Sequence, residues 1–108
     1  MTATRLESFR AMVARNPANP LARFGLANEA HKERPYEEAR ENYEAYLAAS
    51  DDEGNAYGKL GEVLHALGRT VEARAVYARG IEAARRFGHP GMVSDLEARI
   101  EELDAESL

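Results

Sequence analysis

The sequence predicts an all-α fold built from antiparallel helix-turn-helix repeats, and three observations indicate it. Its 108 residues are rich in Ala, Glu, Arg and Leu, which favour helix. Pro and Gly are few and lie mostly between segments in which apolar residues recur every three or four positions. The segment EARENYEAYLA, residues 38–48, is similar to EARAVYARGIE, residues 72–82, at an offset of 34 residues. We therefore expect a single domain with one modest core, in which one helical unit occurs twice.

The first two expected helices have recognisable starts. Thr4 and Glu7 form a Thr-x-x-Glu capping box, which satisfies free amides at a helix N-terminus. The apolar residues that follow share one helix face: Leu6, Phe9, Met12 and Val13. Asn19 can cap a second helix, and Pro20 fits its first turn because an N–H is not needed there. This helix is expected to run to about Lys32, since the ERP tripeptide that follows disfavours α conformation.

Four more helices are expected in the remainder of the chain. The first three span residues 36–49, 54–67 and 70–87. The segment SDDEGN separates the first two, with Asp51 or Asp52 as a cap, and Gly68 makes the next turn. The segment GHPG ends the third, with Gly88 placed for a left-handed residue after the helix. A last amphipathic stripe comprises Met92, Val93, Leu96, Ile100 and Leu103.

An internal repeat relates the middle of the chain to itself. Comparison of residues 20–49 with residues 54–83 at an offset of 34 gives eight identities. They are Ala22/Ala56, Leu26/Leu60, His31/His65, Glu38/Glu72, Ala39/Ala73, Arg40/Arg74, Tyr43/Tyr77 and Ala49/Ala83. A period of this size indicates a helix pair that buries its apolar face against its neighbours. The expected organisation of residues 1–108 is a half-repeat helix at 2–19, repeats at 20–53 and 54–87, and a closing helix and tail at 88–108.

These residues resemble the tetratricopeptide repeat family, in the form of a small bacterial-type member. The first helix of each unit carries Leu followed by Gly or Ala, and the second carries Ala and then an aromatic residue four places later. The matching residues are Leu26, Ala27, Ala39 and Tyr43, then Leu60, Gly61, Ala73 and Tyr77. The sequence departs from the pattern at Arg23, where a large apolar residue is usual, and at Asp51 and Arg85, where proline is usual. The resemblance implies a short right-handed α-solenoid.

The pattern has a physical reason in helix packing. Small residues at Ala27, Gly61, Ala39 and Ala73 would let paired helix backbones approach closely. The two repeated tyrosines would fill the volume beside them. Replacing Ala39 or Ala73 with Leu is expected to overpack this contact and to destabilise the fold by roughly 1–3 kcal/mol.

The resemblance also implies a function, namely binding a peptide or protein segment in a groove lined by the first helices of the repeats. The groove-facing residues would be Leu21, Phe24, Gly25, Asn28, His31, Lys32, Asn55, Gly58, Lys59, Glu62 and His65. Asn28 and Lys59 resemble parts of the clamp with which some members hold a C-terminal carboxylate. Phe24 and Gly58 stand where its second lysine is usual, so a full clamp is not expected. Asn28 and Lys59 are equally explained as solvated residues, and Phe24 either as a groove contact or as packing displaced from Arg23.

No cofactor, metal site or catalytic centre is expected. The chain has no cysteine, which removes thiolate ligands and thiol nucleophiles. His31 and His65 repeat at equivalent positions, but two ligands are too few for a zinc site. GNAYGKL differs from a phosphate-binding loop, since three residues separate its glycines and Leu60 follows the lysine. We therefore expect an adaptor or scaffold and not an enzyme.

Charge and hydropathy limit the expected partners. The net charge of −5 disfavours nucleic acid, because binding phosphates needs clustered Lys and Arg. The N-terminal segment lacks the apolar stretch of a signal peptide or a membrane span, and the absence of cysteine fits a reducing cytoplasm, so a cytoplasmic location is expected. The closing stripe is expected to cap the array. The alternative function is homo-oligomerisation, for example as a homodimer, through this stripe or the open N-terminal half-repeat.

Overall fold

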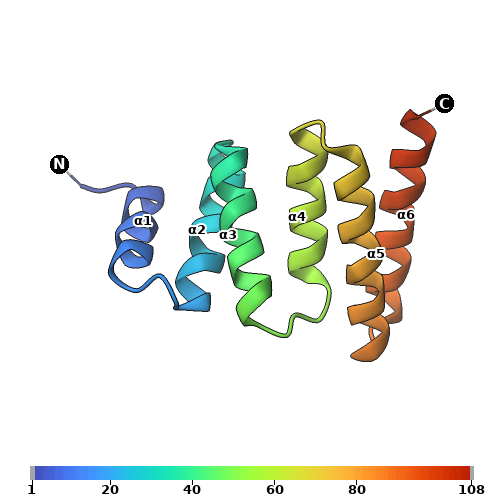
Figure 1. The fold of residues 1–108 in the computed structure, drawn as a ribbon, viewed down its shortest axis with the longest axis horizontal. Coiled ribbons are helices and arrows are strands. Elements are labelled where there is room, and N and C mark those ends of the chain that lie inside the picture. The colour runs from blue at the N-terminus through green and yellow to red at the C-terminus, as the bar shows by residue number, and fades with distance from the viewer. Residues whose placement is uncertain (1, 108) are drawn as a thin grey trace. The chain divides into compact units, whose positions relative to one another are not determined.

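The computed structural model describes residues 2–107, so Met1 and Leu108, the outermost residues of the expected domain, lie outside the described residues. The described residues contain six α-helices and no strand, which confirms the all-α class. Their bounds are α1 Arg5–Arg15, α2 Pro20–Glu33, α3 Tyr36–Ala49, α4 Asn55–Ala66, α5 Thr70–Arg86 and α6 Pro90–Glu106 (Figure 1). The helices divide into two compact units, one ending at Ser50 and one beginning at Asp51. The repeat boundaries given above stay a prediction.

The helix ends form as the local sequence predicts. The Thr4 hydroxyl accepts from the Glu7 amide at 3.1 Å, and the Glu7 carboxylate accepts from the Thr4 amide at 3.2 Å, which completes the capping box. The Asn19 side chain accepts from the amide of Leu21 at 3.0 Å. The Asp52 carboxylate accepts from the amides of Gly54 and Ala56, both at 2.9 Å, and so supplies the cap of α4. These bonds satisfy amides that an α-helix leaves free at its start.

Left-handed residues close several helices. Gly88 follows α5 with φ +75°, as expected from GHPG, and Gly68 has φ +76° in the turn between α4 and α5. Arg34 takes φ +81° at the end of α2, where no glycine is available, and its amide donates to the Ala30 carbonyl at 2.9 Å. The backbone strain of a non-glycine residue at such an angle is a local cost.

In the first unit, α2 packs against both α1 and α3. Its core contains Leu26, Ala27 and Ala30 from α2 and Ala39 and Tyr43 from α3. α1 contributes less, since none of residues 5–15 is buried and Met12 is 39% exposed.

In the second unit, α5 packs against both α4 and α6, so the expected closing helix is an integral part of the unit. The core contains Leu60 and Leu64 of α4, Tyr77 of α5, and Leu96 and Leu103 of α6. A β-carbon at Gly61 would lie 2.2 Å from Cε1 of Tyr77. This contact confirms that a small residue in one helix accommodates the repeated tyrosine of the next.

Candidate functional site

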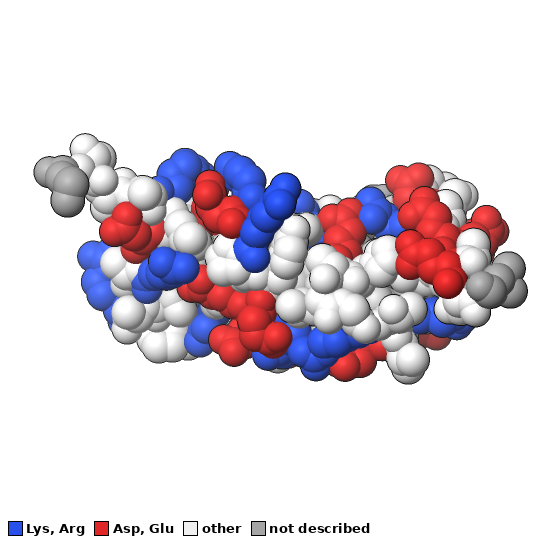
Figure 2. All heavy atoms as spheres, turned by 90° about the horizontal axis from the view of Figure 1, so that it is seen from above, with Lys and Arg blue, Asp and Glu red and all other residues white. Residues whose placement is uncertain are grey.

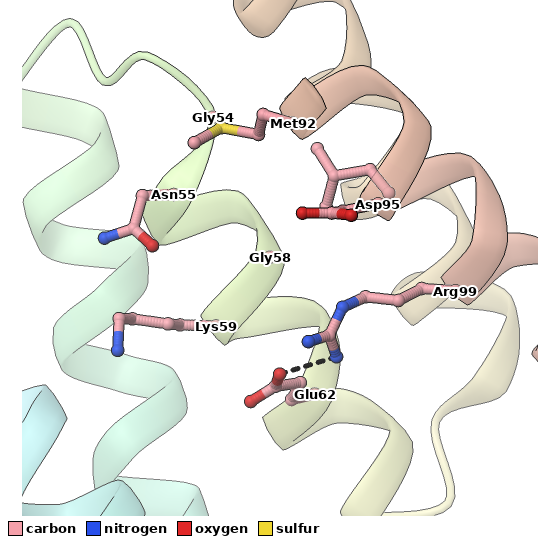
Figure 3. Close-up of a pocket in the computed structure, with 9 residues that line it drawn as sticks. Gly54, Asn55, Gly58, Lys59, Glu62, Met92, Asp95 and Arg99 are labelled. Atoms are coloured by element: carbon pink, nitrogen blue, oxygen red, sulfur yellow. Dashed lines mark ion pairs between the residues drawn. The ribbon is translucent and has the colours of Figure 1, made fainter. Parts of the chain in front are cut away.

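A pocket of about 200 Å³ opens between α4 and α6 in the second unit (Figure 3). Its lining residues are Gly54, Asn55, Gly58, Lys59, Glu62, Met92, Asp95, Leu96 and Arg99. Both helices present positions spaced three and four apart, which places these side chains on one face of each helix. We call this feature the α4–α6 pocket.

Glycines shape the floor of the α4–α6 pocket. A β-carbon at Gly58 would lie 3.3 Å from Cδ2 of Leu96, and one at Gly80 would lie 3.0 Å from Cδ1 of the same residue. Gly54 has φ +128°, and a β-carbon there would lie 2.5 Å from the Met92 sulfur. The missing side chains therefore make room for Leu96 and Met92, which form the apolar part of the pocket.

An ion pair joins the two walls. Arg99 of α6 reaches Glu62 of α4 at 2.5 Å (Figure 3), and its guanidinium also interacts electrostatically with the Tyr77 hydroxyl of α5. Burial opposes the charge of Arg99, but Glu62 and Tyr77 hold the pKa of its guanidinium above the ordinary value. Burial raises the pKa of Tyr77, and Arg99 offsets only part of that rise. Arg99 thus links all three helices of the unit.

Three other polar side chains of the pocket are not used by the fold. Asn55, Lys59 and Asp95 have no hydrogen bond or ion pair with another residue between 2 and 107. Asp95 lies on the α6 side, whereas the Lys59 ammonium extends from α4 away from Arg99 (Figure 3). The pocket therefore combines a small apolar floor with hydrogen-bonding groups that are free to meet a ligand, a combination typical of binding sites.

The structure thus brings together four residues of the predicted groove, namely Asn55, Gly58, Lys59 and Glu62. His65 lies outside the pocket, where its Nε2 is 2.7 Å from the carboxylate of Glu106. Among the described residues, no group of three His, Cys, Asp or Glu side chains could hold a metal ion.

Most of the predicted groove residues of the first unit contact other side chains of that unit. The Phe24 ring lies 4.7 Å from the Tyr46 ring and 6.1 Å from the Tyr43 ring, centroid to centroid. Phe24 therefore packs on α3 and stays partly exposed, so both interpretations of this residue remain predictions. A β-carbon at Gly25 would lie 2.2 Å from Phe9, so this glycine makes room for α1. Leu21 is 76% exposed.

Asn28 and His31 share a partner in the first unit. The Tyr43 hydroxyl donates to Oδ1 of Asn28 at 2.7 Å and lies 3.1 Å from Nδ1 of His31. Because a hydroxyl has only one proton, the His31 ring must donate from Nδ1 when Tyr43 donates to Asn28. Lys32 is exposed and lies 3.6 Å from the Glu29 carboxylate. Asn28 and His31 therefore hold Tyr43 in place, and Lys32 remains accessible at the surface.

Sequence reasoning missed the α6 wall of the pocket, namely Met92, Asp95 and Arg99. The stripe predicted for this helix contains apolar residues alone. The missed signal is the spacing, since Asp95 and Arg99 stand three and seven residues after Met92 and so share the face of Leu96.

Comparison with known proteins identifies the family. The family model described as "Tetratricopeptide repeat" matches residues 30–100, well over half of the sequence. The chain is a tetratricopeptide repeat (TPR) protein. Repeats of this family generally mediate protein–protein interactions, and proteins with this fold are typically interaction scaffolds without catalytic activity.

Two solved structures are similar to this TPR protein. One is a tetratricopeptide repeat domain protein from Salinibacter ruber, 30% identical, with a TM-score of 0.74; the match covers 83% of this chain and 91% of that one. The other is a protein from Bordetella parapertussis, 27% identical, with a TM-score of 0.80; the match covers 98% of this chain and 91% of that one. No curated protein matches the sequence. None of the helices within residues 2–107 is both long enough and apolar enough to cross a membrane.

Proposed function

We propose that this TPR protein is an adaptor that binds a segment of another polypeptide in the α4–α6 pocket. The observation that carries the proposal is the set of unused polar groups, Asn55, Lys59 and Asp95, around a small apolar floor. The backbone amides and carbonyls of a polypeptide segment can form hydrogen bonds with Asn55. Its side chains can contact the apolar floor and pair with Lys59 or Asp95. The predicted groove along α2 remains part of the proposal, with Lys32 and Leu21 as its accessible residues. We also propose a cytoplasmic location and no catalytic role.

Selection of a phage-displayed peptide library on the wild-type protein tests this proposal. Enriched peptides would be synthesised, and their Kd would be measured by fluorescence anisotropy. We expect Asn55→Ala combined with Lys59→Ala to weaken binding by about tenfold or more, which corresponds to about 1.4 kcal/mol. Glu82→Ala on the exposed surface of α5 is the control, since it changes a charged side chain outside the pocket. Equal affinity of both variants for every enriched peptide, or failure to enrich any peptide, would contradict the proposal.

Self-association is a second candidate function, and the charges of the terminal helices favour it. α1 contains three arginines and one glutamate, whereas α6 contains six acidic residues and one arginine. α1 also has an exposed apolar residue in Met12 and contacts only α2 extensively. Pairing α1 of one copy with α6 of another would make a heterologous contact. Light scattering across a hundredfold concentration range tests this, and a mass that stays monomeric throughout would exclude it.

A further inference from the structure

Some charged side chains of the α4–α6 pocket form an ion pair within the protein, and others do not. Glu62 and Arg99 neutralise one another across the pocket at 2.5 Å. Asp95 and Lys59 carry opposite charges without an ion pair among the described residues, but only Asp95 belongs to α6, the helix that supplies the apolar residues Met92 and Leu96. A ligand seated on this floor therefore meets an unpaired carboxylate first.

The surroundings of Asp95 strengthen its attraction for cations. Residues 51–108 contain 12 acidic and seven basic side chains, whereas residues 1–50 contain seven of each. The whole net charge of −5 thus resides in the second unit. Figure 2 shows acidic side chains gathered over α6, whose place is given by Figure 1. A one-sided charge of this kind raises the local concentration of oppositely charged groups and speeds their association.

We infer that the segment bound in the α4–α6 pocket presents a basic side chain, lysine or arginine, to Asp95. This inference rests on the proposed function. Lysine and arginine bury their aliphatic stems against apolar surface while the charged end stays in a polar environment. Here the stem would lie along Met92, above the nearly buried Leu96, and the charged end would reach the carboxylate. The thioether side chain of Met92 suits such a contact, because methionine is flexible and adapts to side chains of different shape.

The size of the pocket agrees with one such side chain. About 200 Å³ corresponds to about six or seven water molecules, at roughly 30 Å³ each. One long side chain fills this space, and the backbone of the segment would then lie across the mouth beside Asn55. An acidic side chain on the floor is disfavoured, since it would meet the like charge of Asp95.

The test uses four nine-residue peptides with a fixed Gly, Ser and Ala background and Arg, Lys, Gln or Glu at the centre. Each is titrated into isotopically labelled protein, and amide shifts of residues 92–99 are followed by NMR. We expect the Arg and Lys peptides to bind about three- to tenfold more tightly than the Gln peptide, and the Glu peptide to bind most weakly. Asp95→Asn should remove this preference, and Asp95→Lys should invert it.

Glu101→Gln is the matched control, because it removes the same charge from an exposed site on the same helix. Its preference for basic peptides should match the wild type. Peptides that shift the pocket amides with no dependence on the central charge would overturn this inference and leave the proposed function standing. Absence of binding by any of the four peptides, together with failure of the library selection, would overturn both. If Asp95→Asn instead abolishes self-association seen by sedimentation, the occupant is the arginine-bearing α1 of a second copy, and the inferred external segment is wrong.

Discussion

The Tyr77 hydroxyl of α5 interacts electrostatically with the Arg99 guanidinium of α6, and Arg99 also pairs with Glu62 of α4. Replacing Arg99 with Met keeps an apolar stem but leaves both partners without their cation. We expect the free energy of unfolding, measured in urea, to fall by about 1–3 kcal/mol. A double-mutant cycle with Tyr77→Phe should give a coupling energy of about 0.5–1.5 kcal/mol. Arg85→Met, which breaks only an exposed pair, should cost less than about 1 kcal/mol.

Tyr77 should make stability fall at alkaline pH. Burial raises its pKa in the folded state above that in the unfolded chain, which is about 10. The folded state therefore holds this proton when the unfolded state has lost it, and the free energy of unfolding decreases as the pH rises through this range. Urea midpoints measured from pH 8 to pH 11 should decline more steeply for the wild type than for Tyr77→Phe. Parallel declines would show that Tyr77 does not contribute.

Gly61 should tolerate no side chain. A β-carbon at this position would lie 2.2 Å from the Tyr77 ring, so the ring or the helix must move. We expect Gly61→Ala to destabilise the protein by about 1–3 kcal/mol, despite the higher helix propensity of alanine. Gly91→Ala in the first turn of α6 is the matched control, because a β-carbon there meets no atom within 4 Å. A loss of stability in the control equal to that at Gly61 would contradict this packing explanation.

Arg23 should stabilise the first unit through a buried amide. Its Nη1 donates to Oδ1 of Asn42 at 3.0 Å, and its Nε donates to the Pro17 carbonyl at 2.9 Å. Asn42 is only 4% exposed, so Arg23→Met leaves a buried acceptor without its donor, at a cost of about 1–3 kcal/mol. Arg15→Met, at an exposed arginine of α1, should change urea stability by less than about 0.5 kcal/mol. Adding Asn42→Leu to Arg23→Met should recover part of the loss, and a further equal loss would contradict the assignment.

The helices and their partners within the repeat could be predicted because they depend on short-range signals. Thr4, Asn19 and Asp52 cap helices through residues at most four positions away. The small residue at Gly61 and the aromatic at Tyr77 belong to one repeated pattern, so each predicts the other.

The α6 wall of the pocket and the role of Arg23 could not be predicted in the same way. Arg99 pairs with Glu62 across 37 residues, and Arg23 reaches Asn42 only because α2 and α3 pack side by side. Such contacts depend on helix rotation about the long axis, which apolar periodicity defines only to within a broad face. Phe24 left two alternatives open for this reason, and its contact with Tyr46 shows which side of α2 it occupies.

Tyr43 and Tyr77 occupy equivalent positions 34 residues apart, yet their hydroxyls interact with different side chains. Tyr43 uses Asn28 and His31 of the preceding helix, whereas Tyr77 uses Arg99 of the helix that follows. Segment 20–53 therefore contains the polar partners of its tyrosine hydroxyl, whereas the partner of the hydroxyl in segment 54–87 lies outside that segment. In a chain lengthened by duplication, each extra copy of segment 20–53 would bring the partners of its own tyrosine hydroxyl. A second copy of segment 54–87 would bring a buried tyrosine equivalent to Tyr77 but no arginine equivalent to Arg99. This segment therefore suits only the position directly before α6.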